Sequence, residues 1–274
     1  SGQDTISNSD SDALGTNADT IQFGAGVTID NIVLTRSSTN LIIALAGTSD
    51  KLTVSSYFNG DGTTACTVEN LKFADGTIWD IATVKAKVML ATAGNDSLYG
   101  YATADTLVAG DGNDTLTDAS GKALFDGGSG TDTLTGGSSA ELYLGGLGND
   151  TLTTGAGNDV ILFNKGDGQD TFAAGGTGSD TLSLGGDFAY SDLSFSKSSN
   201  NLVLKMGASD QITFKNWYAT TPSKPVVNLQ VIAEAMADFD AGGSNPLLDQ
   251  KVENFNFAGL VSAFDAARTA NPTL

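Results

Sequence analysis

Apolar and polar residues follow two different patterns along this chain of 274 residues. Over residues 19–75 and 180–258 they alternate with a period of two, which predicts half-buried β-strands. Over residues 91–184, single apolar residues instead recur in short segments such as Thr133-Leu134-Thr135, and glycine-rich stretches separate these segments. A leucine flanked by β-branched residues, bounded by glycines, predicts a strand of about three residues. The chain therefore reads as mostly β.

The central segment is a repeat with a nine-residue step. Aspartates that precede an apolar position are separated by 9 or 18 residues, and they are Asp96, Asp105, Asp114, Asp132, Asp150 and Asp159. The glycines between them supply left-handed turns and let main-chain carbonyls converge. One turn and one short strand per repeat predict a coil of strands, with two repeats in each coil. Turns then alternate between two opposite edges, and residues 18 apart stack.

The two edges differ in their carboxylates. The first edge has an aspartate in every row, whereas the second has Ala123 and Glu141 at two of its four aspartate positions. Carboxylates stacked about 5 Å apart repel each other strongly unless a cation lies between the coils. Carboxylate and carbonyl oxygens suit Ca²⁺, which takes 6–8 of them, better than Mg²⁺, which demands octahedral geometry. The alternative is that these are only turn sequences, but turns do not require an 18-residue register.

Charge and composition exclude several functions. The chain has 13 Lys and Arg against 32 Asp and Glu, a net charge of −19, which argues against binding to nucleic acid or an anionic membrane. It has no histidine and one cysteine, so Ser-His-Asp and Cys-His catalysis and an intrachain disulfide are excluded. No apolar run reaches the length of about 18 residues that spans a membrane. We expect no enzyme activity.

The repeats resemble the RTX, or haemolysin-type calcium-binding, nonapeptide Gly-Gly-x-Gly-x-Asp-x-apolar-x, a family known for Ca²⁺-binding β-rolls. The best matches are residues 127–135 and 145–153. The resemblance implies a parallel β-roll that holds several Ca²⁺ ions and is exported through type I secretion machinery. It assigns metal ligands to aspartates and turn residues: Asp19, Gly94, Asn95, Asp96, Asp105, Gly110, Gly112, Asp114, Gly128, Gly130, Asp132, Gly146, Gly148, Asp150, Gly155, Gly157, Asp159, Asp170 and Asp180.

The flanks carry a longer duplication, with an offset of about 160 residues. Asp50-Lys51-Leu52-Thr53-Val54 corresponds to Asp210-Gln211-Ile212-Thr213-Phe214, and residues 69–73 are aligned with residues 253–257. Both copies resemble the haemolysin-type calcium-binding protein-related domain and predict antiparallel sheets that cap the roll. Helical spacing of apolar residues predicts helices near 229–239 and 260–270. The predicted domains are the end of a preceding roll (1–22), a capping region (23–90), the roll (91–184) and a second capping region (185–274).

The predicted fold is all-β: a parallel β-roll flanked by antiparallel capping regions, with one or two short C-terminal helices. The predicted function is that of a calcium-binding module in a large secreted or surface-attached bacterial protein, with a structural and secretion role. Three alternatives stay open: an adhesin, S-layer or filament subunit assembled through Ca²⁺; an accessory module of a secreted enzyme or toxin; and a glycan- or partner-binding module. The last requires exposed rings at Tyr57, Phe58, Trp217 or Tyr218, whereas buried rings indicate a cap.

Overall fold

The computed structural model describes residues 2–9, 16–173 and 176–271. Residues 10–15, within the predicted end of a preceding roll, lie outside the described residues. The chain divides into two compact units, Ser1–Leu90 with Ser97–Tyr99, and Ala91–Asp96 with Gly100–Leu274. The described residues contain two α-helices and otherwise mainly strands, so the predicted all-β class is confirmed.

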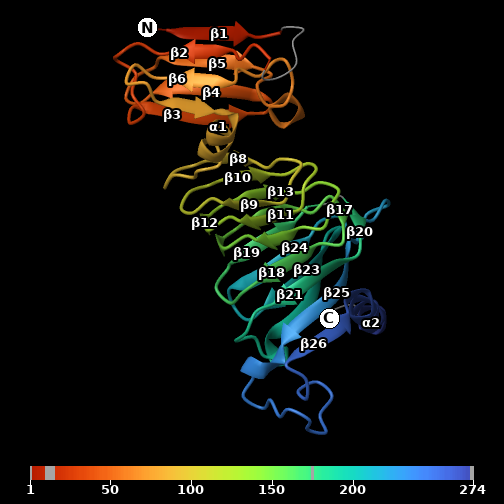
Figure 1. Ribbon diagram of the computed structural model, residues 1–274. Coiled ribbons are helices and arrows are strands. Elements are labelled where there is room, and N and C mark those ends of the chain that lie inside the picture. Colours follow the sequence, from red (N-terminus) through yellow and green to blue (C-terminus); the bar gives the residue numbers. More distant parts are fainter. Residues whose placement is uncertain (1, 10–15, 174–175, 272–274) are drawn as a thin grey trace. The chain divides into compact units, whose positions relative to one another are not determined.

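Two mainly parallel sheets form the roll (Figure 1), and between residues 97 and 184 the strands of successive half-coils alternate between them. The first sheet has eight strands in the order β22 (Leu193–Ser198), β23 (Asn201–Met206), β24 (Asp210–Phe214), β19 (Gln169–Phe172), β16 (Thr151–Thr153), β13 (Thr133–Thr135), β10 (Thr115–Thr117) and β8 (Ser97–Tyr99). The second has seven, in the order β26 (Val252–Asn256), β25 (Val226–Ile232), β21 (Asp180–Leu184), β18 (Val160–Phe163), β14 (Leu142–Leu144), β11 (Ala123–Asp126) and β9 (Asp105–Val108). In the turns, β12 (Ser129–Gly130) pairs with β15 (Leu147–Gly148), and β17 (Ala156–Gly157) with β20 (Thr177–Gly178).

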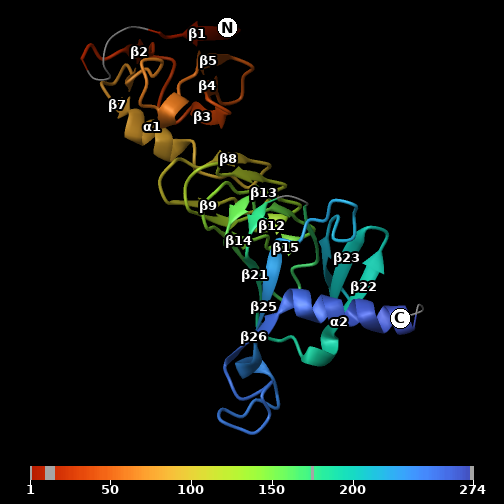
Figure 2. The same ribbon diagram turned by 90° about the vertical axis from the view of Figure 1, so that its right-hand side faces the viewer.

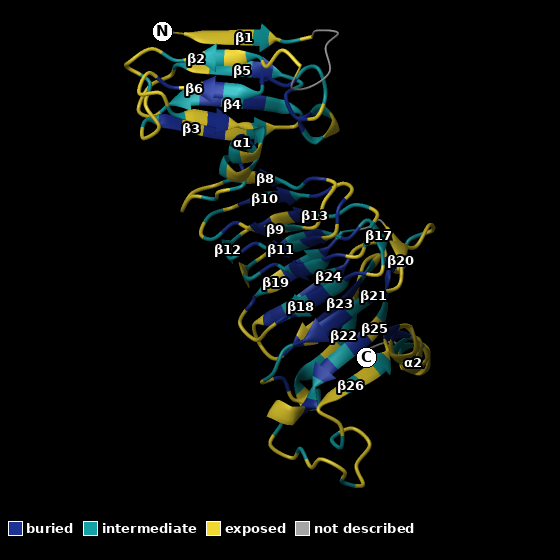
Figure 3. Cartoon of the chain, in the orientation of Figure 1, coloured by how far each residue is buried: buried dark blue, intermediate teal, exposed yellow. Residues whose placement is uncertain are grey.

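The core of the roll consists of two columns of apolar side chains, one from each sheet. The register pairs residues 18 apart, as in Leu116 with Leu134 and Leu134 with Leu152. The column of the other sheet includes Phe125 and Tyr143, whose rings stack with centroids 4.9 Å apart. These side chains are buried (Figure 3). One apolar residue per short strand is therefore enough, because each coil is buried by its neighbours.

The C-terminal region caps the last coil. Strands β24 and β25 continue the two parallel ladders beyond residue 184, and the antiparallel strands β23, β22 and β26 then complete the sheets. Helix α2 (Phe257–Ala270) packs against β25 and β26 (Figure 2), and it confirms the helix predicted near 260–270. Phe214, Trp217 and Phe257 form a buried aromatic cluster with centroids 5.1–5.9 Å apart.

The prediction of a helix near 229–239 is wrong. Residues Val226–Ile232 form β25, and only Ala233–Ala235 form a single 3₁₀ turn, η3. In β25 the buried positions Leu229 and Val231 alternate with less buried ones, as on one face of a strand, and Ala233 just beyond the strand is buried too. The strand is fixed by pairing with β21 on one side and β26 on the other, and this tertiary pairing outweighs the helical spacing of the apolar residues further along the segment.

The first unit has the same plan. Its sheets have the orders β1-β5-β4-β3 and β2-β6-β7. β1 pairs with β5 and β2 pairs with β6 in parallel, and the other neighbours are antiparallel. Their bounds are β1 (Gln3–Ser7), β2 (Thr20–Gln22), β3 (Ile32–Ser37), β4 (Asn40–Leu45), β5 (Lys51–Ser55), β6 (Asn70–Lys72) and β7 (Ile78–Asp80), which leads into α1 (Ile81–Lys87). Two 3₁₀ turns, η1 (Asn59–Asp61) in this unit and η2 (Tyr190–Asp192) in the other, lie between strands.

The sheet pairings correct the alignment of the duplication. Asn70 pairs with the strand β2 as Asn228 pairs with β21, so β6 corresponds to β25. Asp80 and Asn256 each cap the helix that follows, so β7 corresponds to β26. Residues 69–73 therefore correspond to residues 227–231 rather than to 253–257. The second copy is longer than the first because its loop between β25 and β26, which is largely exposed (Figure 3), has extra residues.

The aromatic residues at the ends of the duplicated segments are part of the core. Tyr57, Phe58 and Trp217 are buried, and only Tyr218 is half-buried. The Tyr57 and Phe58 rings meet edge to face, with centroids 4.8 Å apart. Buried rings indicate capping and argue against a glycan-binding surface made by these residues.

Candidate metal sites in the turns

The first edge of the roll carries a column of linked aspartates. Each coil's aspartate N–H donates a hydrogen bond to Oδ1 of the aspartate in the following coil. The N···Oδ1 distances are 2.7 Å from Asp96 to Asp114 and from Asp114 to Asp132, 2.8 Å from Asp132 to Asp150, and 2.9 Å from Asp150 to Asp170. The predicted 18-residue stacking of these residues is therefore present up to Asp150, after which the step lengthens to 20 residues.

The other carboxylate oxygen in this column is left without a partner. Oδ2 of Asp114, Asp132 and Asp150 is buried and has no hydrogen-bond partner among the described residues, and the three side chains are at most 2 % exposed. A buried carboxylate oxygen without a donor costs roughly several kcal/mol in an apolar environment. These three oxygens therefore call for a cation or a proton.

Burial and mutual repulsion disfavour the charged forms of Asp132, Asp150 and Asp170, whose pKa values are raised. Burial, followed by the negative charge of Asp132, raises the pKa of Asp150 to about 6. Burial raises the pKa of Asp170 to about 8, and it also raises the pKa of Asp132. Each raised pKa reflects a carboxylate form that burial and neighbouring charges destabilise. A divalent cation in the turns would compensate this buried negative charge.

Glycine carbonyls complete the lining of the turns. A β-carbon placed on Gly130 would lie 1.6 Å from the Gly112 carbonyl oxygen, so the backbones of adjacent coils touch here, at a φ of +139°. A β-carbon on Gly127 would lie 2.4 Å from the Gly145 carbonyl oxygen and 2.6 Å from Asp132 Oδ2. A carboxylate of one coil and a carbonyl of the next thus face the same spot.

This donor set fits Ca²⁺. Among the described residues, no three carboxylate or thiol groups converge closely enough to hold a metal ion by side chains alone, so main-chain oxygens must take part. Carboxylate and carbonyl oxygens are the ligands of hard cations that accept many oxygens. On the first edge, Asp114, Asp132 and Asp150 would supply the charge. The turn glycines 110, 112, 128, 130, 146 and 148 would supply carbonyls and the space that lets the coils approach.

The second edge has a similar column. The Glu141 N–H donates to Asp159 Oδ1 at 2.8 Å, and the Asp159 N–H donates to Asp180 Oδ1 at 3.2 Å. Glu141 Oε1 and Asp159 Oδ2 are buried without a partner in the described part of the chain. Burial, followed by the charge of Asp159, raises the pKa of Glu141 to about 8. Gly155 and Gly157 lie in this turn, with carbonyls of the preceding coil against them.

Three predicted ligands accept hydrogen bonds that hold their own turn or the stack of turns. Asp96 and Asp105 occupy the first turn of each edge, where their Oδ2 atoms accept hydrogen bonds from the N–H groups of Thr92 and Tyr101. Asn95 Oδ1 accepts from the Asn113 N–H, as part of a ladder of asparagine side chains. These three residues stabilise stacking or their own turn, although the carbonyl of Gly94 still lies against Gly112.

The junction between roll and cap contains two further acids, which lie outside the aspartate register of the repeats. Asp167 and Asp210 are buried, and Asp210 Oδ2 accepts a hydrogen bond from the Gly166 N–H at 2.9 Å. Both add to the negative charge around Asp170. The only signal in the sequence was the duplicated segment that begins at Asp210, which marks this strand as a continuation of the roll.

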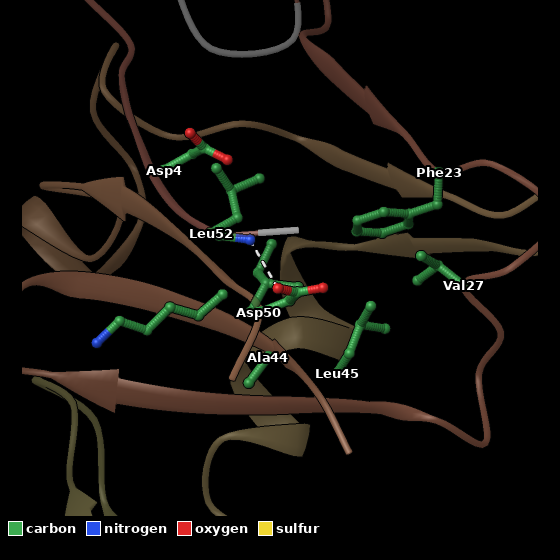
Figure 4. Close-up of a pocket in the computed structure, with 10 residues that line it drawn as sticks. Asp4, Phe23, Val27, Ala44, Leu45, Asp50 and Leu52 are labelled. Carbon is green, nitrogen blue, oxygen red and sulfur yellow. Dashed lines mark hydrogen bonds between the residues drawn. The ribbon is translucent and has the colours of Figure 1, made fainter. Parts of the chain in front are cut away.

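The first unit repeats this junction in a more open form. Asp4 and Asp50 occupy the places of Asp170 and Asp210, because β1 pairs with β5 in the register in which β19 pairs with β24. Asp4 is exposed, and Asp50 accepts a hydrogen bond from the Gly2 N–H at 2.6 Å. Figure 4 shows both beside Phe23 and Leu52 in a pocket of about 240 Å³. The predicted ligand Asp19 also lies in this unit, where Asn8 donates to its Oδ2.

Comparisons with known proteins match these features. Residues 40–83 match the haemolysin-type calcium binding protein related domain, and residues 88–116, 124–140 and 135–171 match the RTX calcium-binding nonapeptide repeat. The family resemblance predicted from the sequence is therefore confirmed. No helix within the described ranges has the length and apolar character needed to cross a bilayer.

Two known proteins show how far the similarity extends. The iron-regulated protein FrpA of Neisseria meningitidis serogroup C is 41% identical over 106 residues, which are 39% of this chain and only 9% of that protein. The extracellular lipase LipA of Serratia marcescens aligns over 78% of this chain and 32% of its own, with 18% identity and a TM-score of 0.26. The chain thus spans a small part of its curated relative.

Proposed function

We propose that this chain, which carries RTX calcium-binding nonapeptide repeats and a haemolysin-type calcium binding protein related domain, is a calcium-binding module of a large secreted bacterial protein. Its role is structural. The roll folds when it meets Ca²⁺ outside the cell, after export of the unfolded chain through type I secretion machinery. Catalysis or adhesion belongs to other parts of the parent protein.

The observation that carries this proposal is the column of buried carboxylate oxygens without partners. Asp114, Asp132 and Asp150 each keep one oxygen satisfied by a main-chain N–H and leave the other buried and unpaired. Without a cation, these charges oppose folding, since each must be buried beside like charges. With bound Ca²⁺, the same groups become ligands, and binding free energy becomes folding free energy. Folding is then controlled by the Ca²⁺ concentration.

A purely structural role is also consistent with the side chains available. The chain has no histidine, and a metal-bound aspartate does not titrate as a general acid near neutral pH. The alternative of self-assembly through Ca²⁺ has no specific support from the described residues. Size-exclusion chromatography with and without Ca²⁺ separates a monomeric module from an assembly subunit.

A circular dichroism titration tests the proposal. In Ca²⁺-free buffer at neutral pH, the far-ultraviolet spectrum should report a largely disordered roll. Millimolar Ca²⁺, in the range of weak extracellular sites, should produce a β spectrum with a sigmoidal dependence on concentration. Identical spectra with chelator and with Ca²⁺ would overturn the proposal. Mg²⁺ at the same concentration is the control and should be much less effective.

A further inference from the structure

The second edge lacks an aspartate at position 123, yet the turn that contains this position has another buried carboxylate. Asp118 lies five residues earlier, at the start of the same turn, and it is 1 % exposed. Its Oδ1 accepts hydrogen bonds from the N–H groups of Ser120 and Gly121, each at 3.0 Å. Its Oδ2 is buried and has no hydrogen-bond partner among the described residues.

Main-chain oxygens surround this unpaired atom. The spot that a β-carbon of Gly121 would occupy lies 2.0 Å from the Thr103 carbonyl oxygen, 2.5 Å from the Tyr101 carbonyl oxygen and 3.0 Å from Asp118 Oδ2. Two carbonyls of one coil and a carboxylate of the next therefore converge. Gly100 also makes room, because a β-carbon there would lie 2.6 Å from Asp118 Oδ2. Two carbonyl oxygens and one unpaired carboxylate oxygen make an environment for a cation.

The turn 118–123 resembles the turn 127–132 of the first edge, except that its aspartate stands at the start of the turn and not at the end. In the turn 127–132, the aspartate stands last and its Oδ2 lies against the glycine that stands first. In the turn 118–123, the aspartate stands first and an alanine stands last. In both turns one carboxylate oxygen is held by main-chain N–H groups and the other is unpaired beside carbonyls of an adjacent coil.

We propose that Asp118 replaces the missing aspartate at position 123 and, with the carbonyls of Tyr101 and Thr103, binds a hard divalent cation of the Ca²⁺ class on the second edge. The nine-residue spacing does not encode this site. The proposal deepens the calcium-binding function and rests on it. The ion neutralises the charge of Asp118 and links the first two turns of the edge.

The substitution Asp118→Asn tests the site with little disturbance of the fold. The amide oxygen of asparagine can still accept the hydrogen bonds of Ser120 and Gly121, whereas its NH₂ group replaces the unpaired oxygen and can donate toward the carbonyls. Asp30→Asn is the matched control, since it makes the same charge change at an exposed residue of the first unit. Equilibrium dialysis with radioactive Ca²⁺ counts the bound ions in the folded full chain.

We expect Asp118→Asn to bind one ion fewer than the wild type and to require more Ca²⁺ at the folding midpoint, while Asp30→Asn changes neither. If the wild type binds Ca²⁺ and Asp118→Asn binds the same number with the same midpoint, the inference fails and the proposed function stands. If the wild type binds no Ca²⁺, the proposed function itself fails.

A second measurement covers the case in which Asp118→Asn does not fold. Tb³⁺ substitutes for Ca²⁺, and its luminescence is excited through nearby tyrosines. Tyr101→Phe keeps the carbonyl and the bulk of the buried ring but removes the phenol. It should lower the tyrosine-excited emission of Tb³⁺ bound to the full chain. An emission equal to that of the wild type would overturn the site.

Discussion

Close contact between glycines of successive coils predicts that Gly130→Ala destabilises the roll far more than its conformation alone requires. The new methyl group would lie 1.6 Å from the Gly112 carbonyl oxygen. Ordinary contact begins near 3.4 Å, so the two backbones must separate by about 1.8 Å, more than a third of the spacing of about 4.8 Å between strands. The hydrogen bonds of Ser129 with Gly110 and Gly112, now 2.8 and 2.9 Å long, would break.

The expected cost follows from these changes. A non-glycine residue at this positive φ costs about 1–3 kcal/mol, and two lost hydrogen bonds add about 1–3 kcal/mol. We therefore expect Gly130→Ala to lower the free energy of unfolding by roughly 2–6 kcal/mol, as the sum of these two terms. The control is Gly207→Ala, at a φ of +77° with no atom within 4 Å of the new β-carbon, which should cost only about 1–2 kcal/mol.

Urea unfolding in saturating Ca²⁺ measures both variants, because the midpoint and the slope together give the free energy of unfolding. The Ca²⁺ concentration must be the same for all proteins, since ligand binding adds to stability. Equal losses for Gly130→Ala and Gly207→Ala would refute the reasoning that the coils are in contact through glycine.

Three further predictions follow from the same structure. Asp132→Ala should lose more Ca²⁺ affinity than Asp105→Ala, because Asp132 has an unpaired buried oxygen and Asp105 serves its own turn; calorimetry that gives equal losses would contradict this. The pKa values of Asp150 and Asp159, raised from 3.8 to about 6, mean that the metal-free fold binds more protons than the unfolded chain, so its stability is greatest below about pH 4 and falls as the pH rises through about 6. Circular dichroism in Ca²⁺-free buffer should therefore show more β-structure at pH 5 than at pH 8, and the reverse order would contradict the burial of these groups. Finally, Phe257→Ala should cost about 3–5 kcal/mol in urea unfolding, because the ring is fully buried against Phe214 and Trp217; a loss below about 1 kcal/mol would show that the cap does not depend on this cluster.

The roll could be predicted from the sequence because the spacing of the repeats sets the length of each coil. Two nine-residue repeats form one coil, so Asp114 lies against Asp132 and Leu116 against Leu134. The need of these stacked carboxylates for a counter-charge was also foreseeable, and their unpaired buried oxygens are consistent with it. Spacing does not show which aspartates are satisfied by their own turn, as Asp96 and Asp105 are.

Features that depend on tertiary pairing were harder to predict. The segment after Val226 has apolar residues at helical spacing, but its neighbours β21 and β26 offer hydrogen-bonding edges that only a strand can use. The alignment of the duplication failed for the same reason, because residues 69–73 resemble β26 in sequence but pair as β25 does. Asp118 was missed because it stands outside the aspartate register of the repeat.

The most direct test of the calcium-binding account is a crystal structure of the chain grown in Ca²⁺, with anomalous differences measured at long wavelength. We predict anomalous peaks on the first edge of the roll, beside the unpaired Oδ2 atoms of Asp114, Asp132 and Asp150 and within about 2.3–2.6 Å of carboxylate and carbonyl oxygens. Turns without anomalous peaks, with those oxygens bonded instead to water or to protein donors, would contradict the account.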